Sequence, residues 1–215
     1  MAQPASVSRI GSRLEAIPSP GLALFGLVLL NLMWGGSIPA TKLALLSFGP
    51  LTLASARLVL AAVLFLLVLR PRAIAAVPAP DALRMAGLGV IGFAGVQVFQ
   101  ALGADQTSGA TATVLAATGP LWIALLAPVL LHERLRPAPL AGVLLALCGV
   151  AAITGAAQAD VGGTLVGNLV VLLSAVCYAL YTVLGKGLAG RYSPMLFCGI
   201  SCLGGAVATL PFAAW

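Results

Sequence analysis

The sequence predicts an all-α polytopic membrane protein, and three observations support this fold class. Of the 215 residues, 61% are hydrophobic and only 7% are charged, whereas soluble domains carry roughly 25% charged residues. Apolar runs of about 18 residues or more, each long enough for a membrane helix, recur along the whole chain. The basic residues between these runs fall mainly in alternate loops. We therefore expect no soluble domain.

About seven membrane-spanning helices are expected. They are placed at about residues 22–41, 51–69, 85–102, 110–131, 139–154, 165–184 and 195–214. The run 110–131 contains no charge, and as a helix it would be roughly 33 Å long, enough to cross a hydrocarbon core of about 30 Å. Gly119 and Pro120 should loosen this helix near its middle, where freed backbone groups must face protein or a wet cavity.

The distribution of positive charge predicts the orientation. Arginines precede the first span and flank the loops after the second, fourth and sixth spans, whereas the other loops lack them. By the positive-inside rule, residues 1–20 form a cytoplasmic segment, and we expect no cleaved signal peptide. Nine arginines against two lysines, with abundant alanine, glycine and leucine, suggest a GC-rich bacterial genome and hence a bacterial inner membrane protein.

Polar and aromatic side chains inside the spans predict a central cavity that binds a small molecule. These side chains recur at helical spacing and so form a stripe along one face of a helix. A helix that faces only lipid is not expected to carry a polar stripe. The alternative is that the aromatic groups lie at the membrane interface and the hydroxyls bond neighbouring helices. The candidate substrate-binding residues are Trp34, Ser37, Gln97, Gln100, Thr118, Trp122, Tyr178 and Tyr181.

Three basic residues, Lys42, Arg57 and Lys186, lie in or beside the spans and are charged candidates for the site. A charge at the bilayer centre costs at least ~2.5 kcal/mol, so Arg57 should be paired, hydrated or snorkelling. A structural role for Arg57, with Asp105 as partner, is as plausible as substrate contact. None of the five acidic residues is expected inside a span, which favours neutral, zwitterionic or anionic cargo over organic cations.

Two sequence patterns are coincidental matches. Gly87, Gly89 and Gly92 match G-x-G-x-x-G, but they lie within a membrane run, so we predict a close helix-packing face instead of a nucleotide site. His132 and Glu133 begin the zinc-protease pattern H-E-x-x-H, yet position 136 is arginine, so the pattern is not completed.

The four cysteines fall in apolar spans, where cysteine acts as a small hydrophobe. We expect no catalytic residue, no metal, no cofactor and no nucleic-acid partner.

An internal repeat with an offset of 144 residues relates the first span to the sixth. Because one repeat then holds five spans, the second copy must enter the membrane from the opposite side, as in inverted-repeat transporters. We predict a first repeat at 21–157 and an incomplete second repeat at 164–215. The offset pairs Trp34 with Tyr178, Lys42 with Lys186, Phe48 with Tyr192 and Pro50 with Pro194.

The chain resembles the EamA-type repeat of the drug/metabolite transporter superfamily over about residues 21–155 and the opening of a second repeat. The resemblance implies ten helices in two inverted five-helix repeats, a central cavity, and export or exchange of small metabolites such as amino acids. His132 stands where such proteins usually have glycine, and three of the ten helices are not in the sequence. The matching positions are Trp34-Gly35 through Pro50, then Arg57, Gly119-Pro120, Leu131, Glu133, Leu135, Gly142 and Gly149-Val150.

We therefore predict a secondary transporter that moves a small metabolite across the lipid bilayer by alternating access. One alternative is a truncated, structural bundle that is inactive, or that works as a homodimer if the natural chain is this short. An intramembrane enzyme is less favoured, because His132, the only histidine, lies in a loop and Ser201 lacks a G-x-S-x-G frame.

Overall fold

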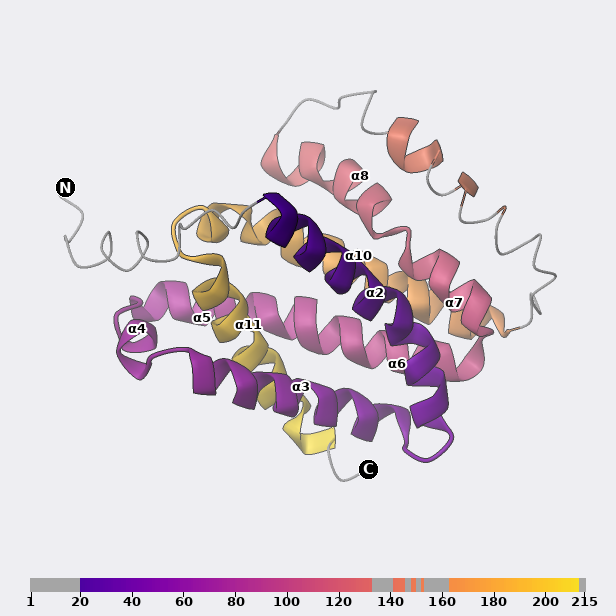
Figure 1. The fold of residues 1–215 in the computed structure, drawn as a ribbon, viewed down its shortest axis with the longest axis horizontal. Helices are drawn as coiled ribbons and strands as arrows, with labels where there is room; N and C mark the ends of the chain where they lie inside the picture. Colours follow the sequence, from indigo (N-terminus) through magenta and orange to yellow (C-terminus); the bar gives the residue numbers. More distant parts are fainter. Residues whose placement is uncertain (1–19, 133–140, 146–147, 150–151, 153–162, 213–215) are drawn as a thin grey trace. The chain divides into compact units, whose positions relative to one another are not determined.

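A computed structural model of the chain describes residues 20–132, 141–145, 148–149, 152 and 163–212. Within these ranges every regular element is a helix, apart from an isolated bridge between Thr107 and Gly163 (Figure 1). The chain divides into a unit of residues 1–37 and a unit of residues 38–215, and each is described by itself. The predicted all-α polytopic fold is confirmed.

Six described helices are long and apolar enough to cross a membrane. Half of the expected fifth span, at 139–154, lies outside the described residues, as does the predicted cytoplasmic segment 1–20 except for Pro20. A short helix, α4 (Pro71–Ala75), follows the second span. The spans are α2 (Pro20–Leu45), α3 (Pro50–Val68), α5 (Ala79–Gly89) with η1 (Val90–Gly95) and α6 (Val96–Gln106), α7 (Gly109–Ala116) with α8 (Gly119–Leu131), α10 (Leu165–Ala189), and α11 (Pro194–Thr209) with η2 (Leu210–Phe212).

The third span begins earlier than the sequence analysis placed it. It runs from Ala79 to Gln106 instead of 85–102, and Asp81 lies buried in its first turn. Asp81 and Asp105 thus lie at the two ends of this span, in its first and last turns. Asp81 is paired with Arg191, a partner distant in sequence, which compensates for the burial of its carboxylate.

The fourth span is broken, as predicted. Helix α7 ends at Ala116 and α8 begins at Gly119, so the discontinuity falls at Ala117 and Thr118, just ahead of Pro120, which has no backbone N–H to donate. Thr118 forms the N-cap of α8, and its hydroxyl donates a 2.6 Å hydrogen bond to the Leu115 carbonyl. The break thus lies inside a membrane span and has its own local hydrogen bonding.

Close backbone packing joins the third span to α10 and α11. A Cβ at Gly89 would lie 1.8 Å from the Ser201 carbonyl oxygen, and one at Gly92 would lie 2.2 Å from the Tyr181 ring. At Gly87, by contrast, no described atom outside the local helix lies within 4 Å of such a Cβ. The predicted packing face therefore holds for Gly89 and Gly92 but not for Gly87.

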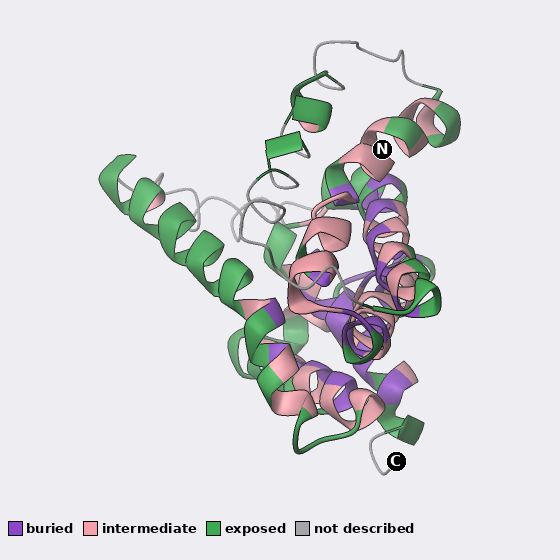
Figure 2. Ribbon diagram, turned by 90° about the vertical axis from the view of Figure 1, so that its right-hand side faces the viewer, coloured by how far each residue is buried: buried purple, intermediate pink, exposed green. Residues whose placement is uncertain are grey.

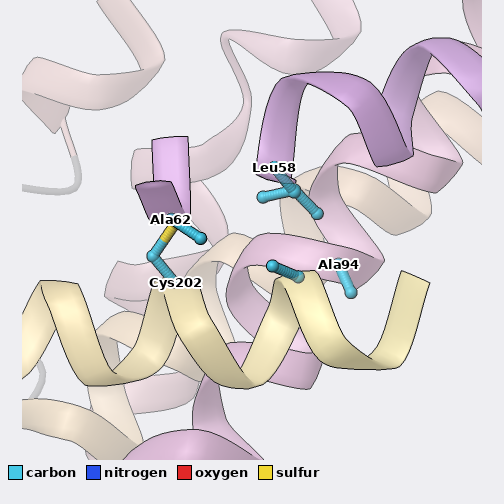
Figure 3. Packing of buried hydrophobic residues seen from close by; sticks show 5 residues of the cluster. Leu58, Ala62, Ala94 and Cys202 are labelled. Atoms are coloured by element: carbon cyan, nitrogen blue, oxygen red, sulfur yellow. The ribbon is translucent and has the colours of Figure 1, made fainter. Parts of the chain in front are cut away.

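The buried residues are mostly small, which lets the helices approach closely. One cluster joins α3, η1 and α11 through Leu58, Ala62, Ala94, Cys202 and Ala206 (Figure 3). Of the described spans, α10 and Pro194–Phe212 have the largest buried share (Figure 2). These two helices are therefore central to the packing of the second unit.

Helix α8 ends in a conformation that favours glycine. His132, its C-cap, has φ 53° and ψ 33°, which is the left-handed region, and its side chain is exposed. This conformation costs a residue with a Cβ about 1–2 kcal/mol relative to glycine. The resemblance to EamA-type repeats implies a glycine at this position, and the left-handed conformation gives a physical reason for it.

We expect His132→Gly to stabilise the protein by about 1 kcal/mol, because glycine relieves the left-handed strain. The midpoint of thermal unfolding of the purified chain in detergent would measure this gain. His132→Ala is the matched control, since alanine removes the imidazole but keeps the Cβ. A glycine variant no more stable than the alanine variant would show that this strain is absent.

Candidate functional site

The break between α7 and α8 brings three of the predicted site residues near one another. Thr118 caps α8 and Trp122 follows one turn later. A Cβ at the intervening Gly119 would lie 3.2 Å from Cδ1 of Tyr178 on α10, so the ring of Tyr178 packs against the start of α8. The broken helix and Tyr178 thus form one local surface.

Trp122 carries a notable unsatisfied donor. Its side chain is half-buried, and its indole Nε1 atom is buried with no hydrogen-bond partner among the described residues. Leaving a buried donor unpaired costs about 1–3 kcal/mol, and such a group usually has a role that the protein alone does not show. An indole N–H beside a broken helix is well suited to donate to a polar group of a solute.

Tyr181 is held mainly by packing. Its ring lies edge-on to Phe93 and stacks on Phe197, with both centroid distances 5.4 Å. The Tyr181 hydroxyl lies 3.9 Å from Sγ of Cys198. These contacts place Tyr181 between η1 and α11, and its predicted contact with substrate stays a prediction.

The other predicted cavity residues are not brought into one site by the described contacts. Gln97 and Gln100 are half-buried on α6, which packs against α3 and α10. Trp34 and Ser37 belong to the unit of residues 1–37, so their relation to the other site residues also stays a prediction.

At one end of the second unit, polar contacts join three connections between spans. Lys42 Nζ donates a 2.5 Å hydrogen bond to the Thr107 carbonyl. The Thr107 hydroxyl bonds the side-chain oxygen of Asn168 on α10, and the Thr164 N–H donates to the Gln106 carbonyl over 3.0 Å. We call this set the Lys42 end. Lys42 thus has a structural contact in addition to any contact with substrate.

The remaining charged candidates have different surroundings. Arg57 Nη1 donates a 2.9 Å hydrogen bond to the hydroxyl of Thr41, which is buried on α2. This contact supports a structural role for Arg57. Asp105 is exposed in the last turn of α6, and its predicted pairing with Arg57 stays a prediction. Lys186 is exposed near the end of α10.

At the opposite end of the third span lies a cluster that the sequence analysis missed. The Asp81 carboxylate forms a 2.9 Å salt bridge with Arg191 and accepts a 2.5 Å hydrogen bond from the Tyr192 hydroxyl. The Arg191 guanidinium also lies 5.6 Å from the centroid of the Tyr192 ring. The hydrogen bond to Asp81 raises the pKa of Tyr192 above its usual range, so Tyr192 remains a protonated donor at neutral pH.

A sequence signal for this cluster existed. Asp81 and Arg191 both lie in connections that the alternation of charged loops places on the same side of the membrane, and they carry opposite charges. Among the described residues there is no group of three or more histidine, cysteine, aspartate or glutamate side chains that could hold a metal ion.

This fold defines the class of protein before any relative is considered. Several apolar helices cross the membrane, one is broken within its span, and another contains a π-helical segment. Interrupted membrane helices are typical of secondary transporters. The EamA-like transporter family model matches residues 21–155 and 165–215, and the chain belongs to this family.

Individual relatives are also transporters by name. A transporter of Archaeoglobus fulgidus whose substrate is unnamed is 28% identical over 83% of this chain and 63% of its own length. A probable terminal-alkyne amino-acid exporter of Streptantibioticus cattleyicolor is 31% identical over 88% of this chain and 63% of its own length. A crystal structure with 25% identity matches with a TM-score of 0.62, covering 83% of this chain and 61% of that chain.

The chain spans 63% of the length of these two relatives. The family and the multi-pass membrane fold are thus established.

Proposed function

We propose that the chain acts in the secondary transport of a small metabolite by alternating access. The observation that carries this proposal is the match to the transporter family in two segments, which begin 144 residues apart, at 21 and 165. Helix bounds follow the same offset. Pro50 and Pro194 open the second span of each segment, and α2 and α10 end at Leu45 and Ala189.

This offset supports two repeats of opposite orientation, 21–157 and 164–215, the second with its first two helices in the sequence. In such an arrangement the connections after the first, third and fifth spans share one side of the membrane. The contacts of Lys42, Thr107 and Thr164 join these three connections. The Asp81–Arg191 pair likewise joins connections of the other side. With the positive-inside rule, the N-terminus is then cytoplasmic in a bacterial inner membrane.

The charges favour a neutral, zwitterionic or anionic substrate, such as an amino acid, over an organic cation. Among the described spans the acidic residues are Asp81, which is paired with Arg191, and Asp105, which is exposed at a helix end. Neither offers the unpaired buried carboxylate that would exchange a proton for an organic cation. The amino-acid exporter among the relatives agrees with this substrate class.

Within this transporter, Trp122, Thr118 and Tyr178 at the broken helix are proposed to contact the substrate. The buried, unpartnered indole N–H of Trp122 would donate to a substrate carboxylate or carbonyl. Binding would then satisfy a donor that has no partner among the described residues.

Counterflow in proteoliposomes containing the full chain tests both statements. We expect exchange of a labelled neutral amino acid, and Trp122→Phe should reduce it about tenfold because one hydrogen bond to the substrate is lost while the aromatic ring remains. Thr113→Ala is the control, since the exposed Thr113 hydroxyl donates to the Gly109 carbonyl of its own helix.

Two results would contradict the proposal. Robust exchange of a quaternary ammonium compound would overturn the substrate class. No flux of any amino acid through folded protein would instead favour a structural bundle, and assays at different protein densities would show whether transport requires a homodimer.

A further inference from the structure

In the contact that joins Asp81 to Arg191 and Tyr192, the anionic side chain is buried whereas the cationic side chain is largely exposed to solvent. The Asp81 side chain is 9% exposed, whereas that of Arg191 is 60% exposed. Both donors come from consecutive residues in the turn that follows α10. A small movement of this turn would therefore remove both partners of the carboxylate at once.

Such a contact can hold two elements together and still open. While it is closed, a charge-assisted hydrogen bond and an ion pair compensate the burial of Asp81. If the turn moved away without water entering, an uncompensated buried carboxylate would remain, which is strongly unfavourable. Opening must therefore admit water to Asp81, and so it opens this end of the protein to solvent.

The residues beneath the contact form the layer that such an opening would expose. A cluster of Val77, Met85, Leu188, Phe197 and Ile200 joins the start of the third span to α10 and α11. Tyr192 and Cys198 both pack against this cluster. Cys198 is thus a partly buried thiol that packs against the same cluster as Tyr192.

The third span and α10 are also joined by hydrogen bonds at the opposite end of the unit. There the Thr107 hydroxyl bonds Asn168, and the Thr164 N–H bonds the Gln106 carbonyl. The π-helical segment η1 lies between the two fastened ends. A carrier that exposes its site to one side at a time must open one such end while the other stays closed.

We propose that Asp81, Arg191 and Tyr192 form a latch that keeps one end of the transporter closed and that opens once in each transport cycle. The proposal rests on the proposed transport function. By the orientation inferred above, this end faces the cytoplasm.

Labelling of Cys198 by a water-soluble, membrane-impermeant maleimide tests the latch. The full chain would be placed in lipid nanodiscs, where the reagent reaches both faces, and modification would be read for each cysteine by mass spectrometry of peptides. Asp81→Asn should raise the labelling rate of Cys198 on the order of tenfold, because it weakens one charge-assisted contact and one ion pair. Arg191→Gln should act in the same direction.

Three comparisons separate a latch from general destabilisation. Arg84→Gln removes an exposed arginine from the same helix and should leave Cys198 unchanged. Cys202, which is fully buried four residues further along α11, should stay unreactive in every folded variant. The double variant Asp81→Asn with Arg191→Gln should label Cys198 no faster than the faster single variant, because both changes break one shared contact.

Unchanged labelling of Cys198 in folded Asp81→Asn protein, or an equal rise at Cys202, would overturn the latch. Failure of the transport proposal would look different. If Cys198 were labelled faster but no variant showed amino-acid flux, this end of the protein would open as proposed, whereas the proposed transport of amino acids would be rejected. Intact flux in Asp81→Asn with unchanged labelling would reject the latch alone.

Discussion

Gly89→Ala should destabilise the protein by about 3 kcal/mol or more, or prevent its folding. The new Cβ would lie 1.8 Å from the carbonyl oxygen of Ser201, 2.5 Å from its carbonyl carbon and 2.7 Å from its Cα. All three are backbone atoms of α11, so no side-chain rotation can relieve the overlap. Helices α5 and α11 would have to separate, and overpacking of close-packed interiors is costly even when side chains can adjust.

The matched control lies two residues away on the same helix. At Gly87 no described atom outside the local helix lies within 4 Å of an added Cβ, so Gly87→Ala should be neutral or stabilise by about 0.5–1 kcal/mol through better helix propensity. Unfolding midpoints of both variants in the same detergent measure the difference. Equal stability of the two variants would mean that α5 and α11 do not pack at this distance.

These two glycines show what a sequence pattern can and cannot determine. Gly87, Gly89 and Gly92 all suggested a packing face, but only the position of α11 and α10 decides which of them needs to be glycine. The positions of the spans were easier to predict, because length and hydropathy alone fix what can cross a bilayer. The break before Pro120 was equally predictable from the missing N–H of proline.

Asp81 shows which contact of a charged residue could not be predicted. The structure buries it beside Arg191 and Tyr192, and Tyr192 is 111 residues away in sequence. Charge counting along the chain cannot anticipate a partner that only folding brings near. The π-helical segment Val90–Gly95 is similar, since nothing in its composition separates it from an α-helix.

The candidate site was predictable only in part. The broken helix with Thr118 and Trp122 followed from local sequence, and the structure adds the proximity of Tyr178 to Gly119. Tyr181 lies 144 residues after Ser37, which is the offset of the internal repeat. The structure shows that its ring packs between Phe93 and Phe197, and no helical periodicity could have separated these two roles.

Tyr181→Ala should cost about 3–5 kcal/mol of stability, the range for removing a large aromatic side chain from a packed core. The change removes the edge contact with Phe93 and the stacking on Phe197, and it leaves a cavity against Gly92. Thermal unfolding in detergent should show a large drop in midpoint. A stable alanine variant would mean that this aromatic cluster contributes little to packing.

Tyr181→Phe separates packing from substrate binding, because it keeps the ring and removes only the hydroxyl. The contact of that hydroxyl with Cys198 is long, at 3.9 Å, so the phenylalanine variant should lose less than about 1 kcal/mol. If Tyr181 is a packing residue alone, amino-acid counterflow through this variant should equal that of the wild type. If the hydroxyl contacts substrate, counterflow should fall while stability is retained. The pair of variants therefore decides between the two roles that a tyrosine in a transporter span can have.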